Sequence, residues 1–490
     1  MKCNPMLLTD FYKISHRIMS ENGIEKTYST FTPRGSRIDD IDEVVFFGLQ
    51  GFIKEYLIEY FNDNFFNRNK KEVIAEYKRI IKYTLGDNCA DIEHIEKLHD
   101  LGYLPIRIRA VKEGTVIPVK VPPFTNENTN NDFHWLTNFL ETLTSASNWK
   151  VITTTTIVKK YRDICEKWAD KTCDSKDHIQ WQCHNFSYRG MAGNEDAITA
   201  GVGHLLYFTG TDTIPSICYL EEYYNANVEK ELVGASVLAT EHSIQCQYQD
   251  DLKYYQRMIN EIAPEGIISI VSDGYDYWNV IGSIIPQLKN DIMNRNGKLV
   301  ARPDTGNPAN IICGDENSEE EIIKKGSIES LWDTFGGTIN SKGYKVLDSH
   351  IGLIYGDSIT PEIAEETFER LERKGFSSEN VVFGIGSYSL GYYTRDTFNI
   401  AIKATDVVIN GEEKMIFKNP KTDKDKIKKS QKGRVVVLQN TETGKITYID
   451  GLTIEQQESY KDIDLLEDVF IDGKLLRDES LSEIRERVLK

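Results

Sequence analysis

The sequence predicts an α/β fold: an irregular α/β barrel of mostly parallel strands, with an additional α+β domain built from the N- and C-terminal parts of the chain. In the middle of the chain, short apolar segments end in glycine or a charged residue, and each is followed by a helical pattern. This order is typical of parallel strands joined by crossover helices. Before residue 150, helical patterns mix with alternating strands, and alternating strands return after residue 396. We therefore predict an α+β domain of residues 1–150 with 397–490, and a barrel domain of residues 151–396.

Four apolar segments are the predicted parallel strands of the barrel. They cover residues 266–271, 299–302, 351–355 and 380–383. The clearest helical patterns behind them cover residues 318–335 and 361–374.

The rest of the chain supplies further predicted elements. Residues 7–16 mix aromatic, acidic and basic side chains without a helical or strand period. Helices are predicted over 44–61, 69–84, 132–147, 157–169, 195–208, from near Pro215, and from Ser243 to about 263; further strands are predicted over 106–111, 115–119, 434–438 and 446–450.

Composition excludes several classes of protein. The net charge of −18 over 490 residues argues against nucleic acid as the main partner, because a phosphate backbone requires a basic face. A small anionic substrate in a local basic pocket remains compatible with this charge. The eight cysteines form no CxxC pair, and no apolar run approaches transmembrane length. We therefore expect a reduced, soluble, cytoplasmic protein that does not bind membranes.

The stretch Arg302-Pro-Asp304-Thr-Gly306 stands at the end of a predicted buried strand. Ligands of α/β folds bind at the carboxyl ends of strands, so this stretch is a candidate site. Arg302 could hold a phosphate through its planar guanidinium, and Asp304 could bind a metal ion or sugar hydroxyls. The alternative is an Arg–Asp pair that only closes a turn.

Other charged residues and glycines occupy similar positions. Together they suit a phosphorylated sugar with Mg²⁺, since acids hold metal and hydroxyls while bases and backbone N–H groups hold phosphate. The strand ends supply Asp273, Arg302, Asp304 and Asp357, and the loops supply Gly384, Gly386, Arg395 and Lys403. The chain has no GxxxxGK[ST] motif, so a P-loop ATPase is not indicated.

Two further segments allow a structural and a functional interpretation. His242, between Glu241 and Ser243, could be a residue of a helix start, or a nucleophile or phosphate ligand. Phe186 and Arg189 could be a core residue and a surface residue, or a stacking platform beside a phosphate clamp. The lysine-rich segment 421–434 is expected to be a solvated loop.

A colinear series of motifs resembles the nicotinamide phosphoribosyltransferases, members of the type II phosphoribosyltransferase family. The resemblance spans nearly the whole chain, which makes it more specific than any single motif. The motifs are Leu7-Leu-Thr-Asp10-Phe-Tyr12-Lys13, Phe47-Gly-Leu-Gln50, Phe186-x-Tyr-Arg189-Gly190, Gly210-Thr-Asp212-Thr213, Glu241-His242-Ser243, Ser272-Asp273-x-Tyr-Asp276, Arg302-Pro-Asp304-x-Gly-Asn-Pro308, Asn340-Ser-Lys-Gly-Tyr344, Gly356-Asp357, Thr394-Arg395-Asp396 and Lys432-Gly433-Arg434.

The resemblance implies a reaction that joins nicotinamide to phosphoribosyl pyrophosphate (PRPP), giving nicotinamide mononucleotide and pyrophosphate for NAD salvage. Phe186 would stack on the pyridine ring, and Tyr12 of a second subunit would cover its other face, so a homodimer with sites at the subunit interface is implied. Mg²⁺ would be held by Asp273 and Asp304. Weak ATP hydrolysis would phosphorylate His242 and stimulate the reaction.

The remaining substrate-binding roles also come from the resemblance. The catalytic set would be His242, Asp304 and Arg302. Substrate contacts would come from Tyr12, Phe186, Arg189, Asp212, Asp273, Arg302, Asp304, Gly356, Asp357, Gly386, Ser387, Arg395, Lys403 and Lys428.

Asp212 bears on the choice of substrate. An aspartate would repel the carboxylate of nicotinate, whereas it can accept a hydrogen bond from the carboxamide of nicotinamide. We therefore favour nicotinamide, with a nicotinate phosphoribosyltransferase as the alternative. A non-catalytic nucleotide-binding protein on the same scaffold is a third hypothesis, distinguished by the absence of pyrophosphate release.

The sequence departs from the family pattern at several positions. Leu238 stands where proline is usual, Thr240 where alanine is usual, Ser387 where glycine is usual and Ala401 where serine is usual. The Cβ of Ser387 could crowd the phosphate-binding loop. The lysine-rich segment carries two extra residues, which affects the match of Lys428 to the lysine near ATP.

Overall fold

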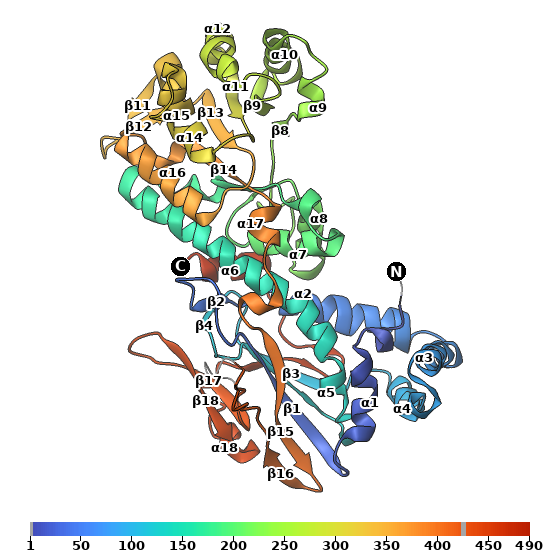
Figure 1. Ribbon diagram of the computed structural model, residues 1–490. Coiled ribbons are helices and arrows are strands. Elements are labelled where there is room, and N and C mark those ends of the chain that lie inside the picture. Colours follow the sequence, from blue (N-terminus) through green and yellow to red (C-terminus); the bar gives the residue numbers. More distant parts are fainter. Residues whose placement is uncertain (1–2, 423–427) are drawn as a thin grey trace. The chain divides into compact units, whose positions relative to one another are not determined.

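The structure is a computed structural model that describes residues 3–422 and 428–490 (Figure 1). The chain divides into two compact units. Unit 1 comprises Met1–Thr156, Leu220–Ala226 and Tyr393–Lys490, and unit 2 comprises Ile157–Tyr219 and Asn227–Tyr392. Residues 423–427 of the lysine-rich segment, for which a solvated loop is predicted, lie outside the described residues.

Unit 2 is built on a parallel sheet of seven strands, in the order β7-β6-β14-β13-β10-β9-β8. A parallel bridge between Gly210 and Ala235 brings the segment that leads into β8 next to β7, so the sheet curls into an irregular half-barrel. The predicted α/β fold class is confirmed. The strands are β6 (Cys183–Asn185), β7 (Gly210–Thr211), β8 (Leu238–Ala239), β9 (Glu265–Val271), β10 (Asn296–Arg302), β13 (Ile351–Tyr355) and β14 (Val381–Ile385).

Helices connect these strands. The helix predicted over 361–374 is α16, which begins with Pro361 after Thr360, whose side chain accepts a hydrogen bond from the Ile363 N–H at 3.3 Å. Such a start is favourable because it satisfies a free N–H group of the first turn. The helices are α7 (Asn194–His204), α8 (Ile214–Tyr223), α9 (His242–Gln245), α10 (Asp251–Arg257), α11 (Tyr277–Asn279), α12 (Ile285–Gln287), α13 (Lys289–Met293), α14 (Pro308–Cys313), α15 (Glu321–Phe335), α16 (Pro361–Arg373) and α17 (Ser387–Gly391); a small hairpin pairs β11 (Gly337–Ile339) with β12 (Lys345–Leu347).

Unit 1 contains an antiparallel sheet to which both ends of the chain contribute, as predicted. Its order is β16-β15-β1-β5-β3-β19-β20, so β1 near the N-terminus lies between β5 and the C-terminal strand β15. The strands are β1 (Ile24–Thr32), β3 (Ile106–Ala110), β5 (Phe124–Asn128), β15 (Ala401–Ile409), β16 (Glu412–Met415), β19 (Glu467–Ile471) and β20 (Lys474–Leu475); β2 (Glu43–Val45) pairs with β4 (Val116–Pro118), and β17 (Arg434–Gln439) with β18 (Ile446–Leu452).

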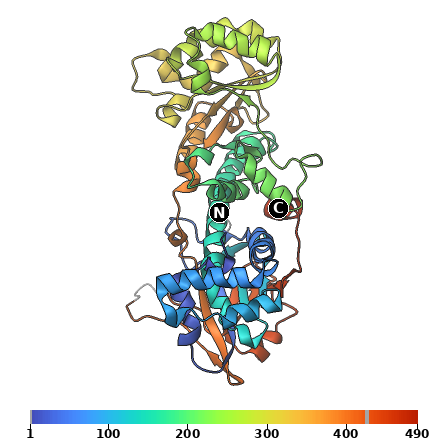
Figure 2. The same ribbon diagram turned by 90° about the vertical axis from the view of Figure 1, so that its right-hand side faces the viewer.

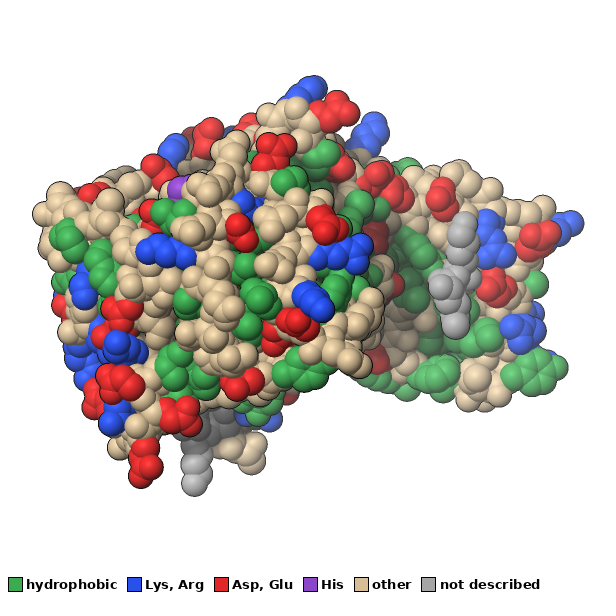
Figure 3. All heavy atoms as spheres, turned by 90° about the horizontal axis from the view of Figure 1, so that it is seen from above, with side chains coloured by type: hydrophobic (Ala, Val, Ile, Leu, Met, Phe, Trp, Pro, Cys, Tyr) green, Lys and Arg blue, Asp and Glu red, His purple; other side chains and the backbone are tan. Residues whose placement is uncertain are grey.

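Helices of the N-terminal segment cover one side of this sheet (Figure 2). None of the helices in the described residues is long and apolar enough to span a membrane. On the face drawn in Figure 3, acidic and basic side chains are interspersed with apolar ones. The helices of unit 1 are α1 (Phe11–Met19), α2 (Leu49–Phe52), α3 (Lys70–Leu85), α4 (Glu93–Leu101), α5 (Leu136–Phe139), the start of α6 (Glu141–Thr172), α18 (Ile454–Glu458) and α19 (Leu481–Val488).

Three predictions for the first 172 residues differ from the structure. Residues 7–16, for which no period was visible, contain the start of α1. The single helix predicted over 44–61 is instead strand β2, followed by α2 and the π-helical segments Ile53–Tyr60 and Asn62–Phe66. The two helices predicted over 132–147 and 157–169 are largely one helix, α6. The run of threonines inside α6 looks like a break, but the hydroxyls of Thr153, Thr155 and Thr156 donate to carbonyls one turn earlier.

Candidate active site

The carboxyl ends of the parallel strands of unit 2 bring most of the predicted site residues to one edge of the sheet. Phe186 follows β6, Asp212 follows β7, Asp273 follows β9, Arg302 ends β10 and is followed by Asp304, Gly356 and Asp357 follow β13, and Gly386 and Ser387 follow β14. His242 begins α9, shortly after β8. Gly384, expected in a loop, lies inside β14.

Arg302 is held between the strand ends. Its Nη2 donates a hydrogen bond to the Thr240 carbonyl, and its guanidinium carbon lies 5.9 Å from the centroid of the Phe186 ring. Burial lowers the pKa of Arg302, and the nearby carboxylates Asp304 and Asp212 oppose this shift. The guanidinium therefore lies beside both an aromatic ring and carboxylates.

His242, Asp273 and Asp304 form a compact cluster. His242 Nε2 lies 3.0 Å from Asp273 Oδ1 and 3.6 Å from Asp304 Oδ1, and the Asp304 N–H donates to Asp273 Oδ2 at 2.9 Å. Burial and the neighbouring Asp273 raise the pKa of Asp304. Burial alone would raise the pKa of Asp273, but hydrogen bonds from the Asp304 N–H, Thr305 and His242 lower it.

The same cluster could hold a metal ion. One ligand atom from each of His242, Asp273 and Asp304 lies within 4.8 Å of the others, and all three residues are half-buried. Carboxylate oxygens at this spacing fit a hard divalent cation such as Mg²⁺.

Phe186 and Asp212 lie together with two residues that sequence reasoning missed. The His184 and Phe186 rings are 4.4 Å apart. His184 Nε2 lies 2.8 Å from Asp212 Oδ1, and the Ser236 hydroxyl donates to the same oxygen at 2.7 Å. Strand alternation could have found His184, because residues two apart in a strand share a face.

Asp212 is held in its ionised form. Burial alone would raise the pKa of Asp212, but the hydrogen bonds from His184 and Ser236 and the charge of Arg302 lower it below its ordinary value. Both hydrogen bonds reach Oδ1, and the Asp212 side chain is 42% exposed. The second carboxylate oxygen can therefore accept a hydrogen bond from a ligand.

Close backbone approach accompanies the glycines of the site. A Cβ at Gly386 would lie 2.2 Å from Asp357 Oδ1, so any larger residue at this position would require the Asp357 carboxylate to move. The Ser387 hydroxyl lies beside Gly190, 2.1 Å from where a Cβ of that glycine would stand. The Ser387 side chain is thus accommodated by Gly190. Arg189 is exposed in the turn Tyr188–Gly190.

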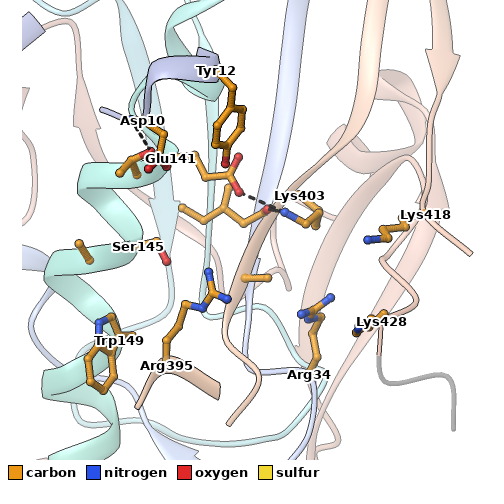
Figure 4. A pocket seen from close by; sticks show the side chains of 14 residues that line it. Asp10, Tyr12, Arg34, Glu141, Ser145, Trp149, Arg395, Lys403, Lys418 and Lys428 are labelled. Atoms are coloured by element: carbon orange, nitrogen blue, oxygen red, sulfur yellow. Dashed lines mark hydrogen bonds and ion pairs between the residues drawn. The ribbon is translucent and has the colours of Figure 1, made fainter. Parts of the chain in front are cut away.

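The other predicted site residues belong to unit 1, where they line a cavity of about 410 Å³ (Figure 4). Lys403 was expected in a loop but lies in β15, where its Nζ is 3.1 Å from Glu141 Oε1. The cavity collects five cationic side chains and so suits phosphate groups. The predicted members of the lining are Tyr12, Arg395, Lys403 and Lys428, and the cations that sequence reasoning missed are Arg34 and Lys418.

The fold and this set of side chains define the class of protein, a phosphoribosyltransferase of type II. The structure is similar to nicotinate-nucleotide pyrophosphorylase from Pyrococcus furiosus, with a TM-score of 0.59 and 14% identity over 99% of this chain and 95% of that chain. It is also similar to human nicotinic acid phosphoribosyltransferase, with a TM-score of 0.53 and 14% identity over 99% of this chain and 93% of that chain. The model of the nicotinate phosphoribosyltransferase (NAPRTase) family matches residues 181–472, and that of the nicotinamide phosphoribosyltransferase N-terminal domain matches residues 4–108.

Curated relatives narrow the class. The nicotinamide phosphoribosyltransferase of Acinetobacter baylyi is 45% identical over 99% of this chain and 97% of its own length. Those of Mycoplasma genitalium and Xanthomonas campestris are 34% and 30% identical, over 87% and 98% of this chain and 94% and 97% of their own lengths. The chain belongs to the nicotinamide phosphoribosyltransferase family.

Proposed function

We propose that the protein transfers the phosphoribosyl group of PRPP to the ring nitrogen of nicotinamide, giving nicotinamide mononucleotide and pyrophosphate in NAD salvage. The observation that carries this proposal is the surrounding of Asp212. Its Oδ1 interacts with His184 Nε2 and the Ser236 hydroxyl, its carboxylate stays partly exposed, and the centroid of the same His184 ring lies 4.4 Å from that of the Phe186 ring. An ionised acceptor beside an aromatic face suits a flat ring with a carboxamide.

Charge supports the amide over the acid. Nicotinate would bring its carboxylate next to the Asp212 carboxylate, and two neighbouring negative charges repel each other unless one of the groups is protonated. The hydrogen bonds that lower the pKa of Asp212 make its protonation less favourable. Nicotinamide presents an N–H₂ group, which donates to a carboxylate without this cost.

The residues of unit 2 suit the charge changes of the reaction. As the bond between ribose C1 and pyrophosphate breaks, the ribose becomes cationic, and Asp304 and Asp357 provide carboxylates for its hydroxyls and its charge. Arg302 orients the substrate beside Phe186, which positions the ring nitrogen for attack on C1. Mg²⁺ would be held by Asp273 and Asp304, and when bound it supplies positive charge to the leaving pyrophosphate.

We further propose that ATP stimulates the reaction through phosphorylation of His242. The γ-phosphoryl group of ATP would pass to a ring nitrogen of His242, its bond to the β-phosphate oxygen would break so that ADP leaves, and the imidazole would release one proton. The His242 side chain is 45% exposed and lies 3.0 Å from Asp273, so it is open to a phosphate donor beside the acids. The added negative charge would orient pyrophosphate together with its bound cation.

The cationic cavity of unit 1 supports the proposal of a homodimer. Its five basic side chains suit the phosphates of PRPP, pyrophosphate or ATP, and Tyr12 at its margin is 58% exposed. A second subunit would bring this cavity, with Tyr12 for the free face of the pyridine ring, to the strand ends of unit 2. We propose that the enzyme works in this form in the cytoplasm, which agrees with its eight free cysteines.

The test is an assay of the pure protein with PRPP and Mg²⁺, with nicotinamide or nicotinate, and with and without ATP. We expect the mononucleotide and pyrophosphate from nicotinamide, and little product from nicotinate. Asp212→Asn and Asp212→Ser should lose at least tenfold in kcat/KM for nicotinamide, about 1.4 kcal/mol, while nicotinate use rises. Equal use of both substrates by the wild-type enzyme would favour the nicotinate alternative, and nucleotide binding without pyrophosphate release would favour a non-catalytic protein.

A further inference from the structure

Thr240 stands where strand β8 leaves the parallel sheet. Ala239 is the last residue of β8 and lies opposite Ser269 of β9, and the Thr240 N–H donates to the Ser269 carbonyl at 3.0 Å. A regular parallel ladder would next direct the Val271 N–H to the Thr240 carbonyl. Instead, the Val271 N–H donates to Thr240 Oγ1 at 2.9 Å. The hydroxyl replaces the main-chain acceptor at this rung.

Because the Val271 N–H donates to the Thr240 hydroxyl, the Thr240 carbonyl has no hydrogen bond to make within the described sheet. That carbonyl accepts a hydrogen bond from Arg302 Nη2. The guanidinium so held lies 5.9 Å from the Phe186 ring centroid. A side-chain hydroxyl in the sheet therefore has an effect at the site, because it frees the group that fixes Arg302.

Helix α10 secures this arrangement through two adjacent tyrosines. The Tyr254 hydroxyl, fully buried, donates to Thr240 Oγ1 at 2.6 Å. Burial raises the pKa of Tyr254 to about 12, so it remains a donor at neutral pH. The Tyr255 hydroxyl lies 2.8 Å from Ser272 Oγ, which accepts the Arg302 N–H at 3.1 Å. Tyr254 therefore supports the guanidinium of Arg302 through Thr240, and Tyr255 supports the main chain of Arg302 through Ser272.

We propose that Thr240 is a positioning residue for the nicotinamide site: its hydroxyl accepts the Val271 N–H, so that its carbonyl can hold Arg302 over Phe186. This inference rests on the proposed function. It gives a role to one of the positions at which the sequence departs from the family pattern, where alanine is usual.

The test compares Thr240→Val, which keeps the shape but removes the acceptor, with Thr240→Ser, which keeps the hydroxyl. We expect Thr240→Val to raise the KM and the dissociation constant for nicotinamide about tenfold, with kcat within about threefold, since one buried donor loses its acceptor and Arg302 its partner. Thr240→Ser should restore wild-type values. Tyr254→Phe should give an intermediate effect, and adding it to Thr240→Val should cost little more.

A matched control is Thr156→Val in unit 1. The Thr156 hydroxyl also accepts a strand N–H, that of Val45 at 3.0 Å, so this variant should lose thermal stability but keep the wild-type KM. The inference is wrong if Thr240→Val binds nicotinamide like the wild type, and Thr240→Ala takes its place if the valine variant does not fold. It is also wrong if Thr240→Ser binds nicotinamide as weakly as Thr240→Val. If the wild-type enzyme forms no mononucleotide, the proposed function is refuted instead. The dissociation constants for nicotinamide, measured directly, would still compare the Thr240 variants with the wild type.

Discussion

His242 is the residue whose role depends most on its neighbours. Its ring reaches Asp273 and Asp304 on adjacent strand ends. We expect His242→Ala to abolish stimulation by ATP and to leave basal turnover measurable, because Arg302 and the acids stay in place. Initial rates with and without ATP, together with a count of ADP released per mononucleotide, measure both effects.

The matched control for His242 is His350, which forms a similar pair with Asp348 at 2.7 Å. His350 precedes β13 and so lies at the opposite edge of the same sheet. His350→Ala should leave the ATP stimulation intact. Undiminished stimulation in His242→Ala would contradict the proposed phosphorylation.

At the residue scale, sequence reasoning found the charged strand ends but missed their supports. Asp273, Arg302 and Asp304 are recognisable because charge after an apolar strand is unusual, whereas Asp212 was predicted only from the family resemblance of the motif Gly210-Thr-Asp212-Thr213. Ser236 gives no such signal, since a serine in a loop is ordinary, and His184 could be found only from the strand alternation that it shares with Phe186. The contribution of Thr240 depends on its hydroxyl replacing a backbone acceptor, and no local pattern in the sequence contains that information.

At the scale of elements, the close approach of β13 and β14 shapes the site. A Cβ at Gly384 of β14 would lie 2.4 Å from the Gly356 carbonyl carbon, against backbone that cannot move aside. We expect Gly384→Ala to destabilise the protein by about 1–3 kcal/mol through overpacking and to lower kcat/KM. Urea midpoints of unfolding and steady-state kinetics check this.

Gly352 in β13 is the control for this prediction. Among the described residues, a Cβ there would meet side chains only, Lys298 Cδ at 3.3 Å and Val300 Cγ2 at 3.6 Å, and no backbone atom. Gly352→Ala should leave stability unchanged or raise it by about 0.5 kcal/mol, because alanine restricts the unfolded chain. If both variants behave alike, the packing argument for Gly384 fails.

Prediction of the elements succeeded where strands are apolar and failed where polar residues are buried. Strands β9, β10, β13 and β14 were predicted because each contains a run of apolar residues, most of them buried. Strand β1 was not, because it buries Thr27, Ser29, Thr30 and Thr32 inside the sheet, where no apolar period is visible. Its pairing with distant β15 also exceeds the range of any local pattern.

At the scale of the whole molecule, the predicted homodimer can be tested by mixing inactive subunits. Lys403→Ala alters the cavity of unit 1, and Asp304→Asn alters the strand ends of unit 2. If each site combines unit 1 of one subunit with unit 2 of the other, a mixed dimer holds one intact site. Co-expression in equal amounts should then restore about a quarter of the wild-type activity.

The control for this mixing experiment pairs two variants of unit 2, Asp304→Asn and Arg302→Ala, and should restore nothing. Size-exclusion chromatography with light scattering must show dimers in every sample. Dimers that remain inactive in the Lys403→Ala mixture would contradict a site shared between subunits.

The position of β1 between β5 and β15 has a consequence for how the chain is made. On the ribosome, β1 emerges among the first residues, yet its partner β15 emerges after all of unit 2. Until then one edge of β1 has no neighbour, and such an edge invites pairing with other nascent chains. All the strands of unit 2 have been synthesised before β15 emerges, so unit 2 can fold before unit 1. Release of a chain that stops before residue 401 would therefore leave a complete parallel sheet attached to an unfinished, aggregation-prone one.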